Sequence, residues 1–227
     1  MQPPIRHPAR TSAVLLALFL LLLALVAASW GPLDRADRDI VVSLHHSAVT
    51  HHGRTETARV LSDWVWDPWT MRALLAVVVG WLLWRRERLL AGWVAATAAL
   101  GTLLQQGIKG TVGRARPHWP DPVDSAHYSA FPSGHALTAA VACGLVVWVM
   151  ALHGARTRWL APVAVAGAVS VFGVGFTRLY LGVHWPSDVL GGWLLGAALV
   201  YAAVAAYPYV AARDGGRAPA DQGSVRS

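Results

Sequence analysis

Long hydrophobic runs, separated by more polar connections, organise this chain. Six of them are long enough, or nearly so, to cross a bilayer as helices rising about 1.5 Å per residue: residues 12–30, 68–84, 89–108, 136–152, 160–176 and 189–212. The second run is the weakest, because Arg72 lies near its outer end and must extend its charge to the interface. The runs are too long and too uniformly apolar for barrel strands. The pattern therefore predicts an all-α, polytopic membrane protein with six transmembrane helices.

The first run has a second interpretation. Arg6 and Arg10 precede it, and Ala27-Ala28-Ser29 lie near its end, which is also the pattern of a cleaved signal peptide. Its apolar part is long for a signal, so a retained span is favoured. In either case the residues that follow emerge on the same side of the membrane.

The composition agrees with a membrane protein. Of the 227 residues 55% are hydrophobic and 14% are charged, whereas about a quarter of a soluble domain is charged. The formal net charge is +7. No basic cluster is interleaved with aromatic residues, so nucleic acid is not expected as a partner, and attraction to anionic membrane lipid is the simpler use of the charge. The single cysteine, Cys143, can form no internal disulfide.

The short connections predict the orientation. The side of the termini carries 10 lysines and arginines and the other side carries 9, so this count does not determine the orientation. The turns at 85–88 and 156–158, however, are compact and basic. Cytoplasmic turns have this character. We therefore expect both termini to be cytoplasmic, with an N-terminal segment over 1–11, a six-span domain over 12–212 whose catalytic part covers about 89–210, and a disordered cytoplasmic tail over 213–227.

Three short motifs hold most of the residues that could carry chemistry, each at the end of a hydrophobic run. They are Lys109 with Arg116-Pro117, then Pro132-Ser133-Gly134-His135, then Arg178 with His184 and Asp188. The motifs follow the third run, precede the fourth, and connect the fifth to the sixth. Connections from odd to even spans lie on one face, so the motifs converge whichever way the protein is oriented. With cytoplasmic termini, that face is extracytoplasmic.

The convergent residues suit a phosphate group. Lys109, Arg116 and Arg178 can hold its oxygens, because arginine offers a planar fork and lysine a compact charge. Gly134 allows close approach of the backbone, and Ser133 adds a hydroxyl donor. The turn leads directly into the fourth run, so a helix N-terminus would point at the anion.

Two histidines and one carboxylate can then break a phosphate ester. A carboxylate on one ring nitrogen, as Asp188 offers to His184, fixes the tautomer and leaves the other nitrogen as a nucleophile. His135 is left to protonate the departing oxygen. Water would later attack the phosphohistidine.

The chain resembles the type 2 phosphatidic acid phosphatase superfamily, which includes vanadium haloperoxidases. The family pattern is Lys-x6-Arg-Pro, then Pro-Ser-Gly-His, then Ser-Arg-x5-His-x3-Asp, and its spacing within each motif is kept here. The resemblance implies His184 as nucleophile, Asp188 as its partner and His135 as general acid. It also implies phosphate contacts from Lys109, Arg116, Ser133, Gly134 and Arg178, and a phosphatase that needs no metal or other cofactor and that vanadate inhibits. The one departure is Thr177 in place of serine, which keeps the hydroxyl.

The remaining histidines carry weaker signals. His45-His46 and His51-His52 flank a short apolar stretch in the first outer connection, where a solvated or interfacial loop is favoured over a metal site. His118 and His127 lie between the first two motifs, where they could shape the mouth of the pocket, but ordinary loop residues are favoured. His153 is read as interfacial, at an inner span end.

These observations favour an integral-membrane lipid phosphate phosphatase acting on a lipid phosphate or diphosphate. Undecaprenyl diphosphate is the favoured substrate, by family analogy and because the site is expected to face outside. Phosphatidic acid, phosphatidylglycerol phosphate and a phosphorylated prenyl-sugar lipid are compatible. A phosphoryl transferase to a lipid or sugar acceptor and a non-catalytic lipid-phosphate binding or transport protein remain alternatives. The apolar runs argue against a soluble haloperoxidase.

Overall fold

The structure is a computed structural model that describes residues 7–215. Throughout that range the regular elements are helical, and no strand occurs. In chain order they are α1 (Pro8–Ala27), α2 (Gly31–Thr50), α3 (His52–Val60), the π-helical turn η1 (Leu61–Val65), α4 (Pro68–Trp84), α5 (Arg88–Val112), α6 (Gly134–Leu152), α7 (Thr157–Tyr180) and α8 (Pro186–Gly215). The predicted all-α fold is confirmed for these residues.

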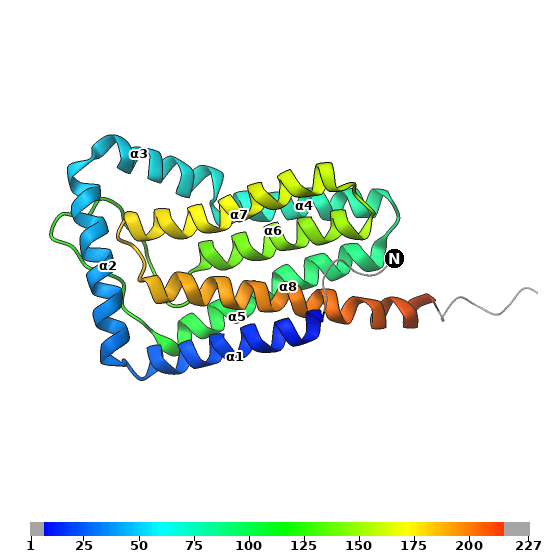
Figure 1. Ribbon diagram of the computed structural model, residues 1–227, viewed down its shortest axis with the longest axis horizontal. Helices are drawn as coiled ribbons and strands as arrows, with labels where there is room; N and C mark the ends of the chain where they lie inside the picture. Colours follow the sequence, from blue (N-terminus) through cyan, green and yellow to red (C-terminus); the bar gives the residue numbers. More distant parts are fainter. Residues whose placement is uncertain (1–6, 216–227) are drawn as a thin grey trace, which may run out of the picture.

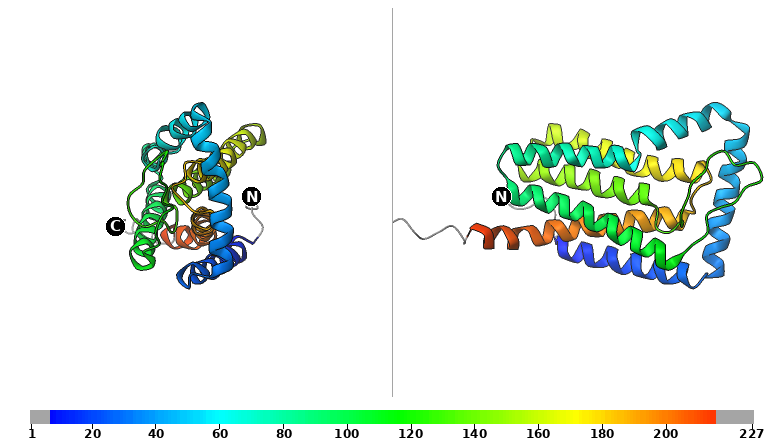
Figure 2. Two further views of the ribbon diagram at one scale, coloured as in Figure 1. Left: turned by 90° about the vertical axis from the view of Figure 1, so that its left-hand side faces the viewer. Right: turned by 180° about the vertical axis from the view of Figure 1, so that it is seen from behind.

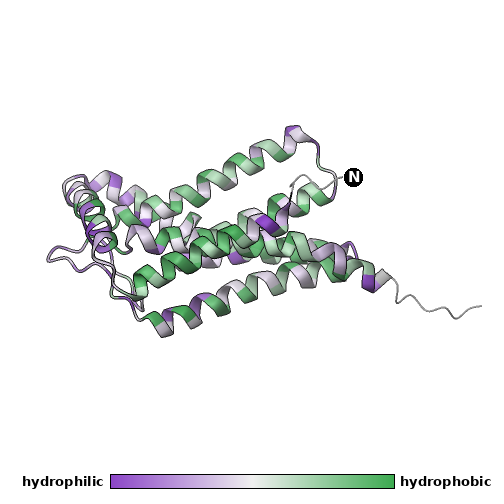
Figure 3. Cartoon of the chain, turned by 60° about the horizontal axis from the view of Figure 1, so that its bottom comes forward, coloured by the Kyte–Doolittle hydropathy of each residue, from purple (hydrophilic) through white to green (hydrophobic). Residues whose placement is uncertain are grey.

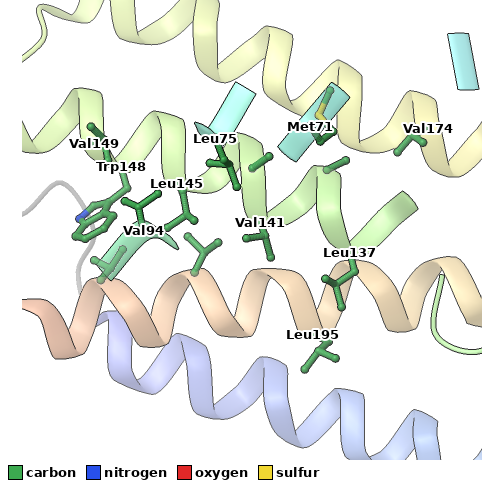
Figure 4. Close-up of a cluster of buried hydrophobic side chains, with 14 of the residues drawn as sticks. Met71, Leu75, Val94, Leu137, Val141, Leu145, Trp148, Val149, Val174 and Leu195 are labelled. Carbon is green, nitrogen blue, oxygen red and sulfur yellow. The ribbon is translucent and has the colours of Figure 1, made fainter. Parts of the chain in front are cut away.

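The long helices form one elongated bundle, and α2 crosses one end of it (Figures 1 and 2). Helix α6 is central and packs against α4, α5, α7 and α8. Leu137, Val141 and Leu145 recur every four residues along α6 and are buried against neighbours such as Val94 of α5 and Leu195 of α8 (Figure 4). This repeat is the buried face of a packed helix.

Five helices are long and apolar enough to cross a membrane: α1, α5, α6, α7 and α8. Hydrophobic residues cover much of the long helices (Figure 3). The chain is therefore a multi-pass membrane protein. Helix α4 has the predicted bounds but only 17 residues, about 25 Å at 1.5 Å per residue. The sixth span and the cytoplasmic placement of the termini stay predictions.

Helix α1 is packed into the bundle along α8. The hydroxyl of Ser12 donates a hydrogen bond to the carbonyl of Ala198 at 2.9 Å. Phe19 is buried and stacks on Phe131, with 6.0 Å between ring centroids. Helix α1 starts at Pro8, and α8 continues to Gly215, so both pass the predicted boundaries at 12 and 212. Residues 1–6 and 216–227 of the predicted terminal segments lie outside the described residues.

The prediction of a loop after the first span was wrong. Residues 31–65 form α2, α3 and η1. Helix α2 buries Asp37, Val41, His45 and Ala48, which recur at helical spacing along one face. That face is partly polar because it packs over the polar end of the bundle. A search for long hydrophobic runs does not detect such a helix.

Candidate active site

The three motifs meet at the end of the bundle that α2 crosses, around a hollow of about 480 Å³. Six of the eight predicted site residues line it: Lys109, Arg116, Gly134, His135, Arg178 and His184. Ser133 and Asp188 are fully buried. Ser133 is hydrogen-bonded to the amide of Ala136, and Asp188 is hydrogen-bonded to His184. The structure thus brings all eight predicted residues together.

Two of the cations come from the last turns of helices. Lys109 lies near the end of α5 and Arg178 near the end of α7, where a positive charge is favourable beside the helix carbonyls. Both side chains are buried, and the Lys109 ammonium donates to the carbonyl of Ser129. The third cation, Arg116, lies in the α5–α6 connection and donates to the carbonyl of Tyr128 at 2.9 Å.

The second motif starts α6 at the hollow. Ser133 is the N-cap residue, and its hydroxyl oxygen accepts from the amide of Ala136 at 3.5 Å. The amide of Ser133 donates to the carbonyl of Asp188 at 2.9 Å, which joins the starts of α6 and α8. A Cβ at Gly134 would lie 3.3 Å from Nε2 of Gln105, so glycine permits this close approach of α5. Free amides of the first turn of α6 therefore lie at the hollow.

The hydrogen-bond partners of His184 define its tautomer. Its Nδ1 lies 3.3 Å from Oδ2 of Asp188, and its Nε2 lies 3.1 Å from Nη1 of Arg116. An ionised carboxylate only accepts and a guanidinium only donates, so the proton is on Nδ1 and the lone pair on Nε2. Asp188 Oδ2 also accepts from the amide of Trp185 at 2.9 Å. This is the arrangement of a nucleophilic imidazole.

Electrostatics keep His184 neutral. The residue is only 1% exposed, and this burial, together with the charges of Arg116 and Arg178, lowers the pKa of His184 well below its ordinary value. Burial and the charge of Arg178 lower the pKa of Arg116 to about 10. At neutral pH the imidazole is therefore uncharged while Arg116 remains a cation.

Arg178 lines the hollow and has one close hydrogen-bond partner and two more distant carboxylates. Its Nη1 lies 2.9 Å from the hydroxyl of Ser62, 3.5 Å from Oδ1 of Asp63 and 3.7 Å from Oδ2 of Asp124. Its Nε is buried and has no hydrogen-bond partner among the described residues. A buried guanidinium donor without a partner is unusual, and an oxyanion in the hollow would satisfy it.

Sequence reasoning missed two sets of polar residues at the site. Asp63, Asp67 and Asp124 line the hollow beside the cations, and Nε2 of His135 lies 4.0 Å from Oδ2 of Asp67. Behind His184, Arg114 contacts Asp188 and Asp37. The only available signal was that Arg114 is a further basic residue between Lys109 and Arg116. Asp37 and Asp63 belong to the first outer connection, for which the sequence predicts a loop.

The departure from the family pattern lies outside the hollow. The hydroxyl of Thr177 donates to the carbonyl of Val174 at 3.0 Å within its own helix. The residue lines a separate groove between α2, α3, η1 and α7. The hydroxyl at this position therefore serves the backbone of α7 in this structure.

The other histidines have varied surroundings. His45, predicted to lie in a loop, is buried on α2, stacks on Trp119 at 4.0 Å between ring centroids and lies 3.2 Å from Oδ1 of Asp121. His46, His51 and His52 are exposed, and no group of three or more metal-binding side chains occurs within residues 7–215. His127 lines the hollow, whereas His153 contacts Glu87 at the opposite end.

Fold and site together define a multi-pass helical membrane protein with a cation-lined hollow at one end of its bundle. A family model described as the PAP2 superfamily matches residues 90–212, more than half of the chain. The chain belongs to this superfamily, as its motifs predicted.

Individual relatives agree with this assignment. The chain is 31% identical over 151 residues to an undecaprenyl-diphosphatase of Sulfolobus acidocaldarius, covering 63% of each protein. It is 34% identical over 102 residues to phosphatidylglycerophosphatase B of Bacillus subtilis, covering 44% of this chain and 49% of the relative. The matches thus span about half to two-thirds of these two relatives.

Two further similarities are more extensive. A decaprenylphosphoryl-5-phosphoribose phosphatase of Mycobacterium tuberculosis is 34% identical over 168 residues, which cover 72% of this chain and 86% of the relative. The crystal structure of a transmembrane PAP2-type phosphatidylglycerolphosphate phosphatase from Bacillus subtilis superimposes with a TM-score of 0.78 at 22% identity, covering 88% of this chain and 97% of that one. At that identity the match establishes a shared fold.

Proposed function

We propose that this protein is a lipid phosphate phosphatase that works through a phosphohistidine. One observation carries the proposal: His184 is neutral, buried and held by Asp188, and its Nε2 lone pair lies among three cations at the edge of a hollow. A nucleophile and charge stabilisation for phosphoryl transfer are thus in one place. Binding alone would need the cations but not an oriented imidazole.

The reaction follows from the positions of the groups. Lys109, Arg116 and Arg178 bind the phosphoryl oxygens, with Ser133 and Gly134 at the helix N-terminus beside them. The Nε2 of His184 attacks phosphorus as the bond to the leaving oxygen breaks, and His135, which takes up a proton when the phosphate anion binds, donates that proton to the leaving oxygen. His135 then takes a proton from water, and the resulting hydroxide attacks the phosphohistidine. Inorganic phosphate leaves and His184 is regenerated, with no step that requires a metal.

An adjoining apolar hollow favours a lipid substrate. It has a volume of about 210 Å³ and lies between α4, α5 and α6, lined by residues such as Leu75, Ala98 and Val141. It shares Arg72 and Thr138 with the larger hollow. A phosphate bound beside His184 can therefore continue into a hydrocarbon chain along this path, whereas a sugar phosphate would leave the path empty.

Undecaprenyl diphosphate is the proposed substrate, and the site is proposed to face the extracytoplasmic side. Two relatives with extensive matches carry polyprenyl groups in their names, the undecaprenyl-diphosphatase and the decaprenylphosphoryl-5-phosphoribose phosphatase. A phosphorylated prenyl-sugar lipid is the second candidate, because the latter relative matches 72% of the chain. The two substrates share a prenyl tail and differ in the group that leaves.

The test is phosphate release by purified protein in detergent with EDTA present. The substrates are undecaprenyl diphosphate, a decaprenylphosphoryl sugar phosphate, phosphatidic acid, phosphatidylglycerol phosphate and a water-soluble sugar phosphate. We expect the prenyl lipids to be hydrolysed fastest, and vanadate to inhibit. Release from the sugar phosphate alone would contradict the lipid assignment. Transfer of phosphate to an added lipid or sugar alcohol would identify a transferase, and no turnover at all would favour a binding protein.

A further inference from the structure

Behind His184, on the side away from the hollow, lies a closed network of buried charges. Nη1 of Arg114 donates to Oδ1 of Asp188 at 2.7 Å and to the hydroxyl of Ser187 at 2.6 Å. Its Nη2 donates to Oδ2 of Asp37 at 2.8 Å, with Oδ1 of Asp34 at 3.4 Å. Asp188 and Asp37 are 0% and 2% exposed and the Arg114 side chain is 12% exposed, whereas the Asp34 side chain, at the edge of the network, is 42% exposed.

The network is also tied to the backbone. Oδ1 of Asp37 accepts from the amide of Ser187 at 2.9 Å, and its Oδ2 accepts from the hydroxyl of the same residue. Helix α2 therefore clamps the first turn of α8, where Asp188 is located. Burial by itself lowers the pKa of Arg114, but the neighbouring Asp188 and Asp37 outweigh it, so the pKa is raised and the guanidinium is a permanent cation.

We infer that Arg114 is a positioning residue for the reaction, with Asp37 of α2 as its anchor. The inference rests on the proposed function, since it concerns the imidazole assigned there as nucleophile. Arg114 does not line the hollow, so it acts through Asp188. It holds one carboxylate oxygen, and this leaves the other oxygen to bind Nδ1 of His184.

Charge and geometry both require an arginine here. A buried carboxylate without a cation is strongly disfavoured, and it would take up a proton or move toward another donor. Either change would remove the acceptor that keeps the proton of His184 on Nδ1. A lysine supplies the charge, but it cannot reach two carboxylates and a hydroxyl with one planar fork.

The test compares Arg114→Gln, Arg114→Lys and Asp37→Asn with the unmodified protein. The measurements are kcat, KM for the preferred lipid, and Ki for inorganic phosphate. In metal sites, loss of an outer partner that orients a ligand costs about 10–100-fold in affinity or activity, and we use that range for the partner of Asp188. We expect a fall of that size in kcat for Arg114→Gln, with KM and Ki within about threefold of the original. Arg114→Lys is expected to be intermediate, and Asp37→Asn to lose less than Arg114→Gln.

Arg59→Gln is the matched control. Arg59 reaches from α3 to the carbonyl of Val123 at 2.9 Å, so it also fastens the α5–α6 connection, but it touches neither His184 nor Asp188. Its replacement is expected to lower the melting temperature and leave kcat unchanged. An equal fall in kcat for this control, or unchanged kcat in Arg114→Gln, would overturn the inference. A rise in KM and Ki at constant kcat would instead make Arg114 a substrate contact and overturn it too.

Two further measurements distinguish a positioning role of Arg114 from a loss of folding and from a failure of the proposed function. Should Arg114→Gln not fold, the folded Arg114→Lys protein decides, and kcat equal to that of the unmodified protein contradicts the role. A double-mutant cycle of Arg114→Lys with Asp188→Asn, followed by thermal unfolding, needs no turnover. Additive changes in melting temperature would refute the coupling. Inactivity of the unmodified protein, with coupling intact, would refute only the proposed function.

Discussion

The two sides of His184 are built in opposite ways. Behind it, Arg114 makes contacts of 2.6–2.8 Å with Ser187, Asp188 and Asp37. In front of it, Arg178 donates to the hydroxyl of Ser62 at 2.9 Å, but it lies 3.5 and 3.7 Å from Asp63 and Asp124 and keeps a buried Nε without a partner among the described residues. Both arginines are largely buried beside carboxylates, so the difference is one of closure rather than of composition.

This difference separates two tasks. The closed side fixes a carboxylate that must not move, and a fully satisfied buried network is rigid. On the open side, Arg178 has one donor without a partner among the described residues and long contacts to two carboxylates, so an incoming phosphate can bind it without a large rearrangement. Changes at the closed side should therefore affect kcat, and changes at the open side should affect binding of phosphate.

The largest effect is expected at the boundary between the two sides. Replacing His184 with alanine removes the nucleophile, and we expect kcat to fall by about 10⁴-fold or more. Phosphate binding should remain, because the three cations are unchanged. Steady-state kinetics and inhibition by phosphate measure the two effects. A variant with full activity would eliminate the phosphohistidine mechanism.

The next effect belongs to the open side. Arg178→Gln removes a donor from the phosphoryl group while keeping a side chain that can bond to Ser62. We expect kcat/KM to fall by about 10²–10³-fold, with a weaker Ki for phosphate. Thr177→Ser, one residue away and outside the hollow, is the matched control and should keep full activity. Loss at Arg178 without any change in Ki would show that the open side does not bind the anion.

The sequence predicts most of the residues on the open side of His184, but not those on the closed side. The hydrophobic runs located α1 and α4 to α8. The three motifs named Lys109, Arg178 and His184, because cations and histidines at the ends of apolar runs need a functional explanation. The convergence of those residues followed from the alternation of spans across a bilayer. The motif pattern supplied the roles.

The closed side could not be predicted because its partners are distant in sequence. Asp37 and Asp188 are 151 positions apart and meet only because α2 folds over the end of the bundle. Helix α2 buries a polar face, which hydropathy reads as a solvated loop. Nothing in the spacing of the first motif distinguishes Arg114 from an interfacial cation. Long-range pairing of buried charges is a property of the tertiary structure.

The pH dependence sharpens the comparison. Burial first, and then Arg116, lower the pKa of His184, so its neutral form persists below the ordinary value of about 6.5. Arg116→Gln removes the positive charge that contacts His184, so the pKa of His184 rises. The acidic limb of the kcat/KM profile therefore moves to higher pH. The measurement is kcat/KM against pH for the unmodified protein and for Arg116→Gln on the same lipid. Ionisation of the substrate affects both profiles equally, so a difference between them reports on the enzyme. Lys109→Gln should move the limb less, and an unmoved limb in Arg116→Gln would contradict the assignment.

The smallest effect tests whether the acids of the open side oppose the ligand. Burial and the neighbouring Asp124 raise the pKa of Asp63, as expected where negative charges crowd together. Asp63→Asn should therefore strengthen inhibition by phosphate about three- to tenfold at neutral pH. The gain should shrink as the pH falls, because Asp63 of the unmodified protein then becomes protonated. Asp39→Asn, on the exposed face of α2, is the control for net charge. If both substitutions strengthen inhibition equally, the change comes from the net charge of the whole protein and not from Asp63 in particular. The carboxylates of the open side would then not compete with phosphate for its cations.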